Sequence, residues 1–233
     1  QAIAEEIYGG NLDWFFRQWF TTTWTLDYSL DEFNSEKTII AGTSGFNTTV
    51  SIRKRGRCIS PLDVTFYFED GSTDTAYIPL DVWIDGRAKF DTTLFFPAKP
   101  EKAVINPDAR LADINRLNNC SGLPSVNWQF MVPKFIYPDN YIENYVESYT
   151  IAHHPTLWYN SIDGAKIGYQ FDGSYLGVAK SARLEASVGL NSWHVNHDAG
   201  YTDRFFEINP NLQYYFRSRE LEGRGRQEIG IYW

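Results

Sequence analysis

The stretch Lys166-Ile-Gly-Tyr-Gln-Phe-Asp-Gly-Ser-Tyr175 alternates between apolar and polar residues and decides how the second half of the chain is interpreted. Its odd-numbered positions from 167 to 171 are isoleucine, tyrosine and phenylalanine. Its even-numbered positions are lysine, glycine, glutamine, aspartate and serine. Because successive side chains of a strand point to opposite faces, the stretch predicts a strand with one apolar and one polar face.

The same alternation recurs further along the chain, at Ala182–Leu190, Phe206–Phe216 and, from its first residues, Glu228–Trp233. Strands of about 9–11 residues with an apolar and a polar face are typical of transmembrane β-barrels. Residues 165–233 are therefore predicted to be the first strands of such a barrel. About eight strands make the smallest barrel that closes, and lipid does not tolerate an open sheet edge. Four strands thus lead us to expect that the chain is a piece of a longer protein.

The charge balance argues against nucleic acid as a partner. The chain of 233 residues has 21 Lys and Arg against 29 Asp and Glu, which gives a net charge of −8. Such a chain has no basic stripe to neutralise phosphates. The one basic cluster, Arg53-Lys54-Arg55 with Arg57, is short, and we expect it to be a solvated strand face rather than a binding patch.

The first half of the chain predicts helices followed by a β-sandwich. Residues 1–35 are helical in pattern, with Asn11 as the expected N-cap of a helix over Leu12–Phe20. Residues 36–119 are expected to form an antiparallel sandwich of short strands separated by turns. Its expected strands are Thr48–Arg53, Asp63–Phe68, Ala76–Leu80, Asp81–Ile84 and Phe90–Phe95. In the first two, alternation is expected to turn Val50, Ile52, Val64, Phe66 and Phe68 inward. Residues 120–164 are rich in proline and aromatic residues, and are interpreted as an irregular connector from the soluble part to the barrel.

Two cysteines, Cys58 and Cys120, leave two readings open. A secreted or periplasmic setting would permit a disulfide between them. The alternative is a pair of independent free thiols.

The histidines offer one metal-like spacing. His194 and His197 stand three residues apart with Asp198 next to them, and a loop that turned all three inward would create a metal site. On a strand, positions i and i+3 point to opposite faces, and exposed loop histidines are the alternative. His153 and His154 are adjacent before a proline, which favours extended backbone in which they diverge, so no site is expected there.

Other charged groups also have competing interpretations. A carboxylate pair among Asp13, Asp27, Asp31 and Glu32 would suit acid–base chemistry, but an acidic surface is the common explanation. Four arginines surround the last predicted turn, Arg217, Arg219, Arg224 and Arg226. They could line a barrel lumen, meet lipopolysaccharide phosphates or belong to a solvated loop.

Several stretches resemble one enzyme family. Gly10–Trp19 resembles the helix near the end of the catalytic domain in aminopeptidase-N-type (gluzincin) zinc metallopeptidases. Five further stretches resemble the Ig-like β-sandwich that follows this helix in that family: Val50–Arg53, Pro61–Val64, Glu69–Gly71, Ile105–Asp108 and Leu111–Asn119. Together these stretches cover about half of the chain, in the family's order. The remainder, from Pro155–Asn160 and Asp163-Gly164 onward, resembles the barrel extension of some bacterial members, especially in the Bacteroidota.

The resemblance implies a chemistry that this chain does not itself carry. The family holds zinc with two histidines and a glutamate, from H-E-x-x-H and a distal glutamate, and the motif glutamate acts as general base. This chain lacks H-E-x-x-H, and its four histidines are those named above. No catalytic, cofactor-binding or metal residue is therefore carried over, and zinc is expected only upstream.

The resemblance thus implies a fragment of a zinc metallopeptidase-like protein anchored in the bacterial outer membrane, with its soluble part in the periplasm or at the cell surface. The implied partners are outer-membrane lipid, a possible outer-membrane protein complex, and a peptide substrate for the intact protein. A non-catalytic, barrel-anchored accessory subunit of a secretion or uptake complex is the first alternative. A soluble β-rich domain with one wet face is the second.

Overall fold

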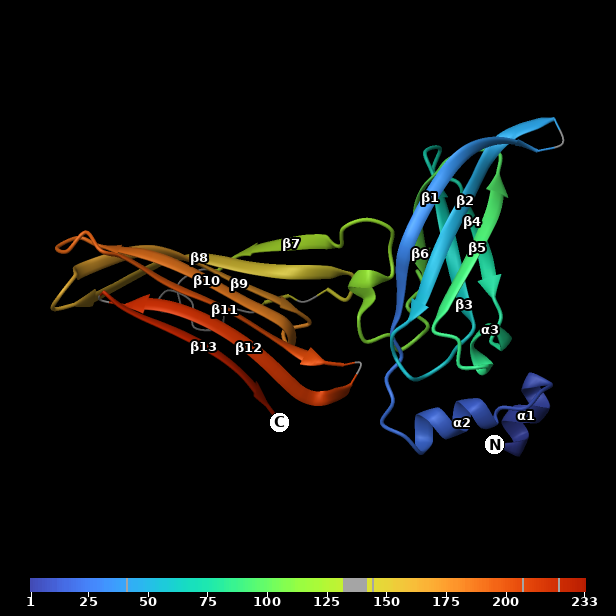
Figure 1. Ribbon diagram of the computed structural model, residues 1–233, viewed down its shortest axis with the longest axis horizontal. Coiled ribbons are helices and arrows are strands. Elements are labelled where there is room, and N and C mark those ends of the chain that lie inside the picture. The colour runs from blue at the N-terminus through green and yellow to red at the C-terminus, as the bar shows by residue number, and fades with distance from the viewer. Residues whose placement is uncertain (41, 132–141, 144, 207, 222) are drawn as a thin grey trace. The chain divides into compact units, whose positions relative to one another are not determined.

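The computed structural model describes residues 1–40, 42–131, 142–143, 145–206, 208–221 and 223–233, and it is mainly β with antiparallel sheets. The chain forms two compact units, residues 1–123 and 124–233 (Figure 1). This confirms the expected mainly β fold class. The division falls inside the segment 120–164 that was expected to be a connector.

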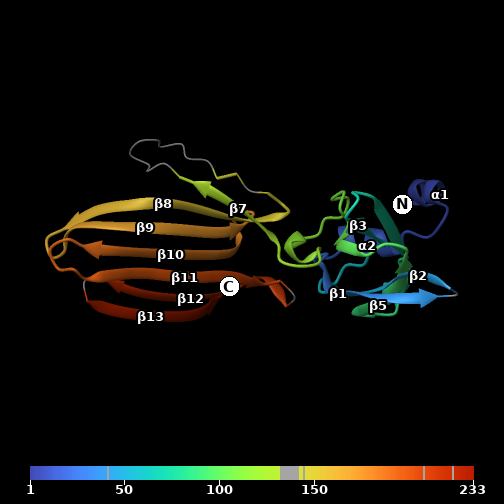
Figure 2. The same cartoon turned by 90° about the horizontal axis from the view of Figure 1, so that it is seen from above.

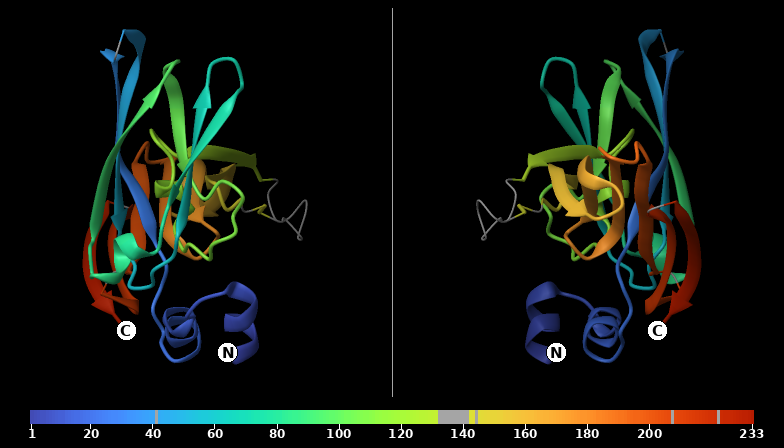
Figure 3. Two further views of the ribbon diagram at one scale, coloured as in Figure 1. Left: turned by 90° about the vertical axis from the view of Figure 1, so that its right-hand side faces the viewer. Right: turned by 90° about the vertical axis from the view of Figure 1, so that its left-hand side faces the viewer.

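Unit 1, residues 1–123, contains two three-stranded antiparallel sheets, ordered β1-β2-β5 and β4-β3-β6, and two helices beyond one end of the strands (Figure 3). Its helices are α1 (Ala2–Tyr8), α2 (Asp13–Phe20), α3 (Asp81–Ile84) and the 3-10 turn η1 (Arg116–Asn118). Its strands are β1 (Tyr28–Ile40), β2 (Thr43–Lys54), β3 (Leu62–Phe68), β4 (Thr73–Ile78), β5 (Lys89–Phe96) and β6 (Pro100–Ile105).

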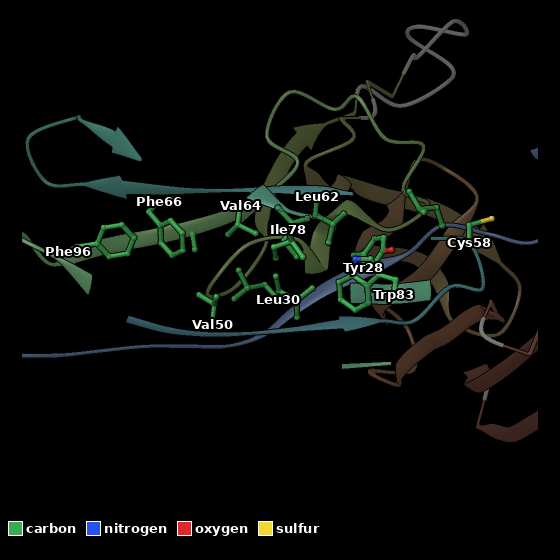
Figure 4. Packing of buried hydrophobic residues seen from close by; sticks show 14 residues of the cluster. Tyr28, Leu30, Val50, Cys58, Leu62, Val64, Phe66, Ile78, Trp83 and Phe96 are labelled. Carbon is green, nitrogen blue, oxygen red and sulfur yellow. The ribbon is translucent and has the colours of Figure 1, made fainter. Parts of the chain in front are cut away.

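The hydrophobic core of unit 1 lies between the two sheets (Figure 4). Val50 and Ile52 reach it from β2, and Val64 and Phe66 reach it from β3. Each of these pairs is two residues apart, which is the period at which a strand returns to the same face. The sequence therefore placed the inward positions of these two strands correctly.

The expected boundary between helices and strands at residue 35 is wrong, because β1 begins at Tyr28. Tyr28 and Leu30 are both buried in the core, and only an extended backbone brings positions two apart to the same side. The N-cap of α2 is Leu12 rather than Asn11. The Asn11 side-chain oxygen still accepts a 2.8 Å hydrogen bond from the Asp13 amide, directly before the helix.

The expected strand Asp81–Ile84 is also wrong, because these residues form the single helical turn α3. The turn directs Trp83 into the core, where its ring centroid lies 5.1 Å from that of Tyr28. Burial of this large indole outweighs the weak preference of a four-residue stretch for strand, because local propensity is a minor term beside packing.

A polar segment closes unit 1. The Asp113 carboxylate accepts hydrogen bonds from the amides of Tyr28 (3.1 Å) and Asn115 (2.9 Å), and the Ile114 amide donates to the Leu26 carbonyl at 3.0 Å. Burial raises the pKa of Asp113, despite these hydrogen bonds. This polar segment is therefore attached to the start of the first strand, at Leu26 and Tyr28.

Unit 2, residues 124–233, is one seven-stranded sheet in the order β13-β12-β11-β10-β9-β8-β7 (Figure 2). All neighbouring strands are antiparallel except β7 and β8, which are parallel. The strands are β7 (Ser125–Phe130), β8 (Ser148–Asn160), β9 (Gly164–Tyr175), β10 (Ala179–Gly189), β11 (Val195–Phe205), β12 (Asn209–Leu221) and β13 (Arg224–Tyr232). Over the described residues the sheet is open, with β7 and β13 at its edges.

Three expectations for this half of the chain need correction. The connector 120–164 is not irregular throughout, because β7 and β8 lie in it; residues 132–141 and 144 of the connector are outside the described part of the chain. The strands expected from the sequence did not include β11. Its apolar face carries a histidine and an alanine among larger apolar residues, which obscures the alternation. The expected strand Phe206–Phe216 begins only at Asn209.

The two cysteines are both free thiols, which decides between the two readings of the sequence. Cys58 is buried in the core of unit 1, and Cys120 is partly exposed. Burial raises the pKa of the Cys58 thiol.

We expect Cys120 to react with iodoacetamide well before Cys58 in the folded chain, because the thiolate is the reactive form and Cys58 is both covered and protonated. Peptide mass spectrometry after timed labelling measures the two rates, and labelling in denaturant serves as the control in which both react. Equal rates in the folded chain, or protection of both thiols until reduction, would contradict this.

Gly56 → Ala is expected to destabilise unit 1 by about 1–3 kcal/mol, because the new Cβ would lie 2.3 Å from the Thr25 carbonyl oxygen and 2.6 Å from the Asp27 amide nitrogen. Backbone atoms on both sides leave little room to adjust. Thermal unfolding followed by near-ultraviolet circular dichroism of the buried aromatics measures the effect. Gly10→Ala is the matched control, since its Cβ would meet only the Tyr8 ring at 3.4 Å.

Candidate functional site

The strands of unit 2 give its sheet one apolar and one polar face. The pairs Leu184↔Phe171, Leu184↔Ala199 and Tyr201↔Phe216 place their side chains on the same face, because directly paired residues of neighbouring strands point the same way. This face, which we call the apolar face, continues onto β8 and β13. Its larger members include Leu157, Tyr159, Ile167, Tyr169, Phe171, Leu184, Val188, Val195, Tyr201, Tyr214, Phe216, Ile229 and Ile231.

The apolar face is the more exposed of the two. Leu157 is 70% exposed, Leu184 52% and Ile229 85%. On the polar face, Lys166 is 0% exposed and Asn196 1%. A water-soluble sheet with one wet face has the opposite arrangement, with its apolar side covered and its polar side in water.

The polar face carries paired charges across neighbouring strands. Arg217 of β12 forms an ion pair with Asp198 of β11 at 2.5 Å. Arg183 of β10 donates to the Gln170 side chain of β9 at 3.0 Å and lies 3.1 Å from Glu185. A hollow of about 460 Å³ lies on this face, lined in part by Arg183, Asp198 and Arg217.

Glycines on the polar face make room for side chains of the adjacent strands. The Tyr215 ring lies over Gly230, and a Cβ at Gly230 would come within 2.5 Å of it. A Cβ at Gly168 would lie 2.5 Å from the Ala186 carbonyl oxygen and 2.7 Å from the Thr156 hydroxyl. These positions admit only glycine in the present packing.

A cluster of rings joins β7, β8 and β9 on the apolar face. The His153 ring stacks on Tyr169 and Phe171, with centroids 5.8 and 6.0 Å away, and its Nδ1 lies 2.7 Å from the Tyr169 hydroxyl. Trp128 and Phe130 of β7 pack on the same ring. His154 belongs to the polar face, so the two histidines diverge as the extended backbone requires.

A buried ion pair holds the turn between β8 and β9. Lys166 Nζ lies 2.5 Å from the Asp163 carboxylate and 4.4 Å from the centroid of the Trp158 ring, and neither charged side chain is exposed. Ser192, in the turn between β10 and β11, donates a 2.5 Å hydrogen bond to Asp163. The carboxylate thus ties two neighbouring turns together.

The metal-like histidine spacing does not come together. His194 is exposed in the turn before β11, whereas His197 is on the apolar face, with its Nε2 3.1 Å from the Ser218 hydroxyl. Asp198 is on the polar face and paired with Arg217. Across the described ranges of the chain, no three histidine, cysteine, aspartate or glutamate residues lie close enough to hold a metal ion.

The four carboxylates weighed as a catalytic pair have separate partners. Asp13 accepts from the Asn11 and Gln1 side chains, and Asp27 accepts from Asn118. Asp31 forms ion pairs with Arg53 and Arg55, and Glu32 lies 3.7 Å from Lys89. They are structural members of unit 1, and nothing draws them into one site.

The four arginines around the last turn all lie at polar-face positions of β12 and β13. Arg217 pairs with Asp198, while Arg219 and Arg226 both pair with Glu228. All four therefore belong to strands rather than to a loop, and Arg224 and Arg226 are exposed.

Comparison with known proteins identified no matching family model, no matching curated protein and no matching solved structure. None of the helices in the described residues has the length and hydropathy needed to cross a membrane.

We expect Asp163→Asn to destabilise unit 2 more than the double variant Asp163→Asn/Lys166→Met does. The single change leaves the Lys166 ammonium buried without its carboxylate, whereas the double change removes both charges. Urea unfolding in detergent measures the midpoints of both variants and of Lys166→Met. A double variant less stable than Asp163→Asn alone would contradict the pair's role.

Proposed function

We propose that residues 124–233 are the lipid-facing part of an outer-membrane β-barrel that anchors the rest of the protein. The observation that carries the proposal is the exposed apolar face, which β8 to β13 share at every second residue. Transmembrane barrels have this arrangement, with apolar residues toward lipid and polar residues toward the interior.

The polar face supports the same proposal. Its charges are balanced by partners on neighbouring strands, as the pairs Arg217–Asp198 and Arg219–Glu228 show. Charged groups that leave bulk water need such partners, because burying an isolated charge is costly. A polar face with ion pairs between neighbouring strands suits the interior surface of a barrel.

Aromatic residues near the strand ends fit a lipid boundary. Tyr159, the last residue but one of β8, is 74% exposed, and Trp193 in the next turn at that end of the sheet is equally exposed. Tyrosine and tryptophan are enriched at membrane–water interfaces, because their rings are apolar while their hydroxyl and indole groups reach water. We assign this end of the sheet to one boundary of the membrane.

The finer proposal rests on the sequence resemblance. We propose that the intact protein is a zinc metallopeptidase-like protein of the aminopeptidase-N type, with peptide hydrolysis in a domain upstream of Gln1 and unit 1 as its Ig-like sandwich. The described part of this chain would then anchor and brace, and would not hydrolyse peptides. The alternative is a non-catalytic accessory subunit of an outer-membrane complex with the same anchor.

The membrane proposal predicts opposite tolerance for charge on the two faces. Leu184→Arg, at mid-strand on the apolar face, should cost about 2–4 kcal/mol and reduce the fraction of chain that floats with phospholipid vesicles, because the guanidinium would meet lipid. Thr202→Arg on the polar face is the matched control and should float like the wild type. Equal flotation of both variants, with a chain that stays monodisperse without detergent, would favour a soluble β-rich domain.

The intact mass of the native protein extracted in detergent tests the finer proposal. A mass far above the 26.9 kDa of this chain, with zinc and aminopeptidase activity that chelation abolishes, is the expected result. A native mass of 26.9 kDa would overturn the peptidase proposal.

A further inference from the structure

A hollow of about 380 Å³ lies in unit 1 between α2 and the end of the sandwich. Its lining includes Trp14 and Arg17 of α2, Trp24 of the segment after α2, Lys54 at the end of β2, Arg57 of the bend that follows, and Trp83 of α3. Three stretches of unit 1, residues 14–24, 54–59 and 83–86, thus meet around one space.

The hollow has a fixed wall, because α2 is hydrogen-bonded to the chain opposite. The buried Gln18 side chain donates from Nε2 to the Ile59 carbonyl at 2.8 Å and accepts from the Ile59 amide at 2.9 Å. One amide side chain thus satisfies both backbone groups of Ile59. A helix held in this way keeps Trp14 and Arg17 in place at the hollow.

The charged groups of the hollow all have the same sign. Arg17, Lys54 and Arg57 line it, and no aspartate or glutamate does among the residues that the structure describes. Burial lowers the pKa of Lys54; Cys58 opposes this shift, and the charge of Arg57 adds to it. Three cations gathered without a carboxylate repel one another, so the cluster favours an anion.

The basic cluster of the sequence is therefore divided in the fold. Arg53 and Arg55 form ion pairs with Asp31, as a solvated strand face does. Lys54 donates a 3.2 Å hydrogen bond to the Gly56 carbonyl, and no ion pair to it is found among the residues that the structure describes. The Arg57 guanidinium stacks 5.2 Å from the centroid of the Trp24 ring. Alternation along β2 turns Lys54 away from the side of Arg53, and the bend after β2, at Gly56 and Arg57, brings Arg57 to the hollow with Lys54.

The rest of the lining is apolar and aromatic. Three indole rings, those of Trp14, Trp24 and Trp83, line it together with the side chains of Ile59 and Ile84. The buried Trp83 Nε1 has no hydrogen-bond partner in the described residues, so the wall also holds an unused donor. Such a lining fits a ligand with an apolar body beside its charge, since few polar groups then fix its orientation.

We propose that this hollow binds a carboxylate-bearing peptide segment in which the acidic group stands next to an aromatic or large aliphatic side chain. The carboxylate meets Lys54 and the two guanidiniums, whose forked donors match its two oxygens. The apolar side chain packs on the indole rings. This inference stands on unit 1 alone and is independent of the membrane proposal.

Small probes test the proposal on the full chain in detergent by isothermal titration calorimetry. N-acetyl-phenylalanine presents a terminal carboxylate, and N-acetyl-aspartyl-phenylalanine amide presents a side-chain carboxylate. N-acetyl-phenylalanine amide is the uncharged control. At least one acid should bind about ten-fold or more tightly than the amide, because hydrogen bonds to charged groups contribute more than neutral ones. The stronger of the two acids identifies the source of the carboxylate.

Variants locate the binding site. Lys54→Gln and Arg57→Gln should each weaken binding of the preferred acid about ten-fold. Arg57 is exposed, so its variant tests the site even where the Lys54 variant folds poorly. Lys102→Gln is the control: it removes a cation that also lies over an aromatic ring, that of Tyr67, but is not part of the hollow.

Three results would overturn the proposal. The first is binding of acid and amide within two-fold of each other, or of neither. The second is inorganic phosphate binding as tightly as the acids, which would make the site a phosphate site. The third is unchanged affinity in both the Lys54 and Arg57 variants.

Discussion

The register between β9 and β10 is the constraint on which unit 2 depends. It pairs Ile167 with Val188 and Phe171 with Leu184. The pairings of the following strands, out to β13, keep the apolar residues on this same face. A shift by one residue would turn every side chain of a strand to the other face, which would put Lys166 and Arg183 among the apolar residues. The two turn-bound groups Asp163 and Ser192 fix this register at one end of the sheet.

Unit 1 depends on a different feature, the polar segment of residues 113–118, which is hydrogen-bonded against the start of its first strand. The Asp113 carboxylate accepts a hydrogen bond from the first amide of β1, and the Asn118 side chain donates one to Asp27, just before that strand. The burial that raises the pKa of Asp113 weakens its tendency to ionise. The contribution of this carboxyl group to stability is therefore largest below its ordinary pKa and is lost as the pH rises through the raised value. These contacts hold a segment rich in asparagine against a core that contains Tyr28 and Trp83.

The sequence predicted the mainly β class, most inward positions of β2 and β3, and the two faces of β9, β10 and β13, because each follows from strict alternation. It could not predict β8 or β11, since His153 and His197 interrupt the apolar series at positions where contacts with Tyr169 and Ser218 accommodate them. Nor could it predict the hollow beside α2, which is assembled by Gln18 across 41 sequence positions. Long-range pairing of this kind leaves no periodic trace in the chain.

The glycines beneath neighbouring side chains have a geometric consequence. Gly168 and Gly230 lie on the polar face, where a Cβ would collide with the adjacent strand or with Tyr215. The polar side of the sheet can therefore occupy a shorter arc than the apolar side, so the sheet can bend toward its charged surface. In a sheet that closes on itself, the radius of that bend and the strand number are linked. Two positions without a side chain would thus help to determine how strongly this sheet curves.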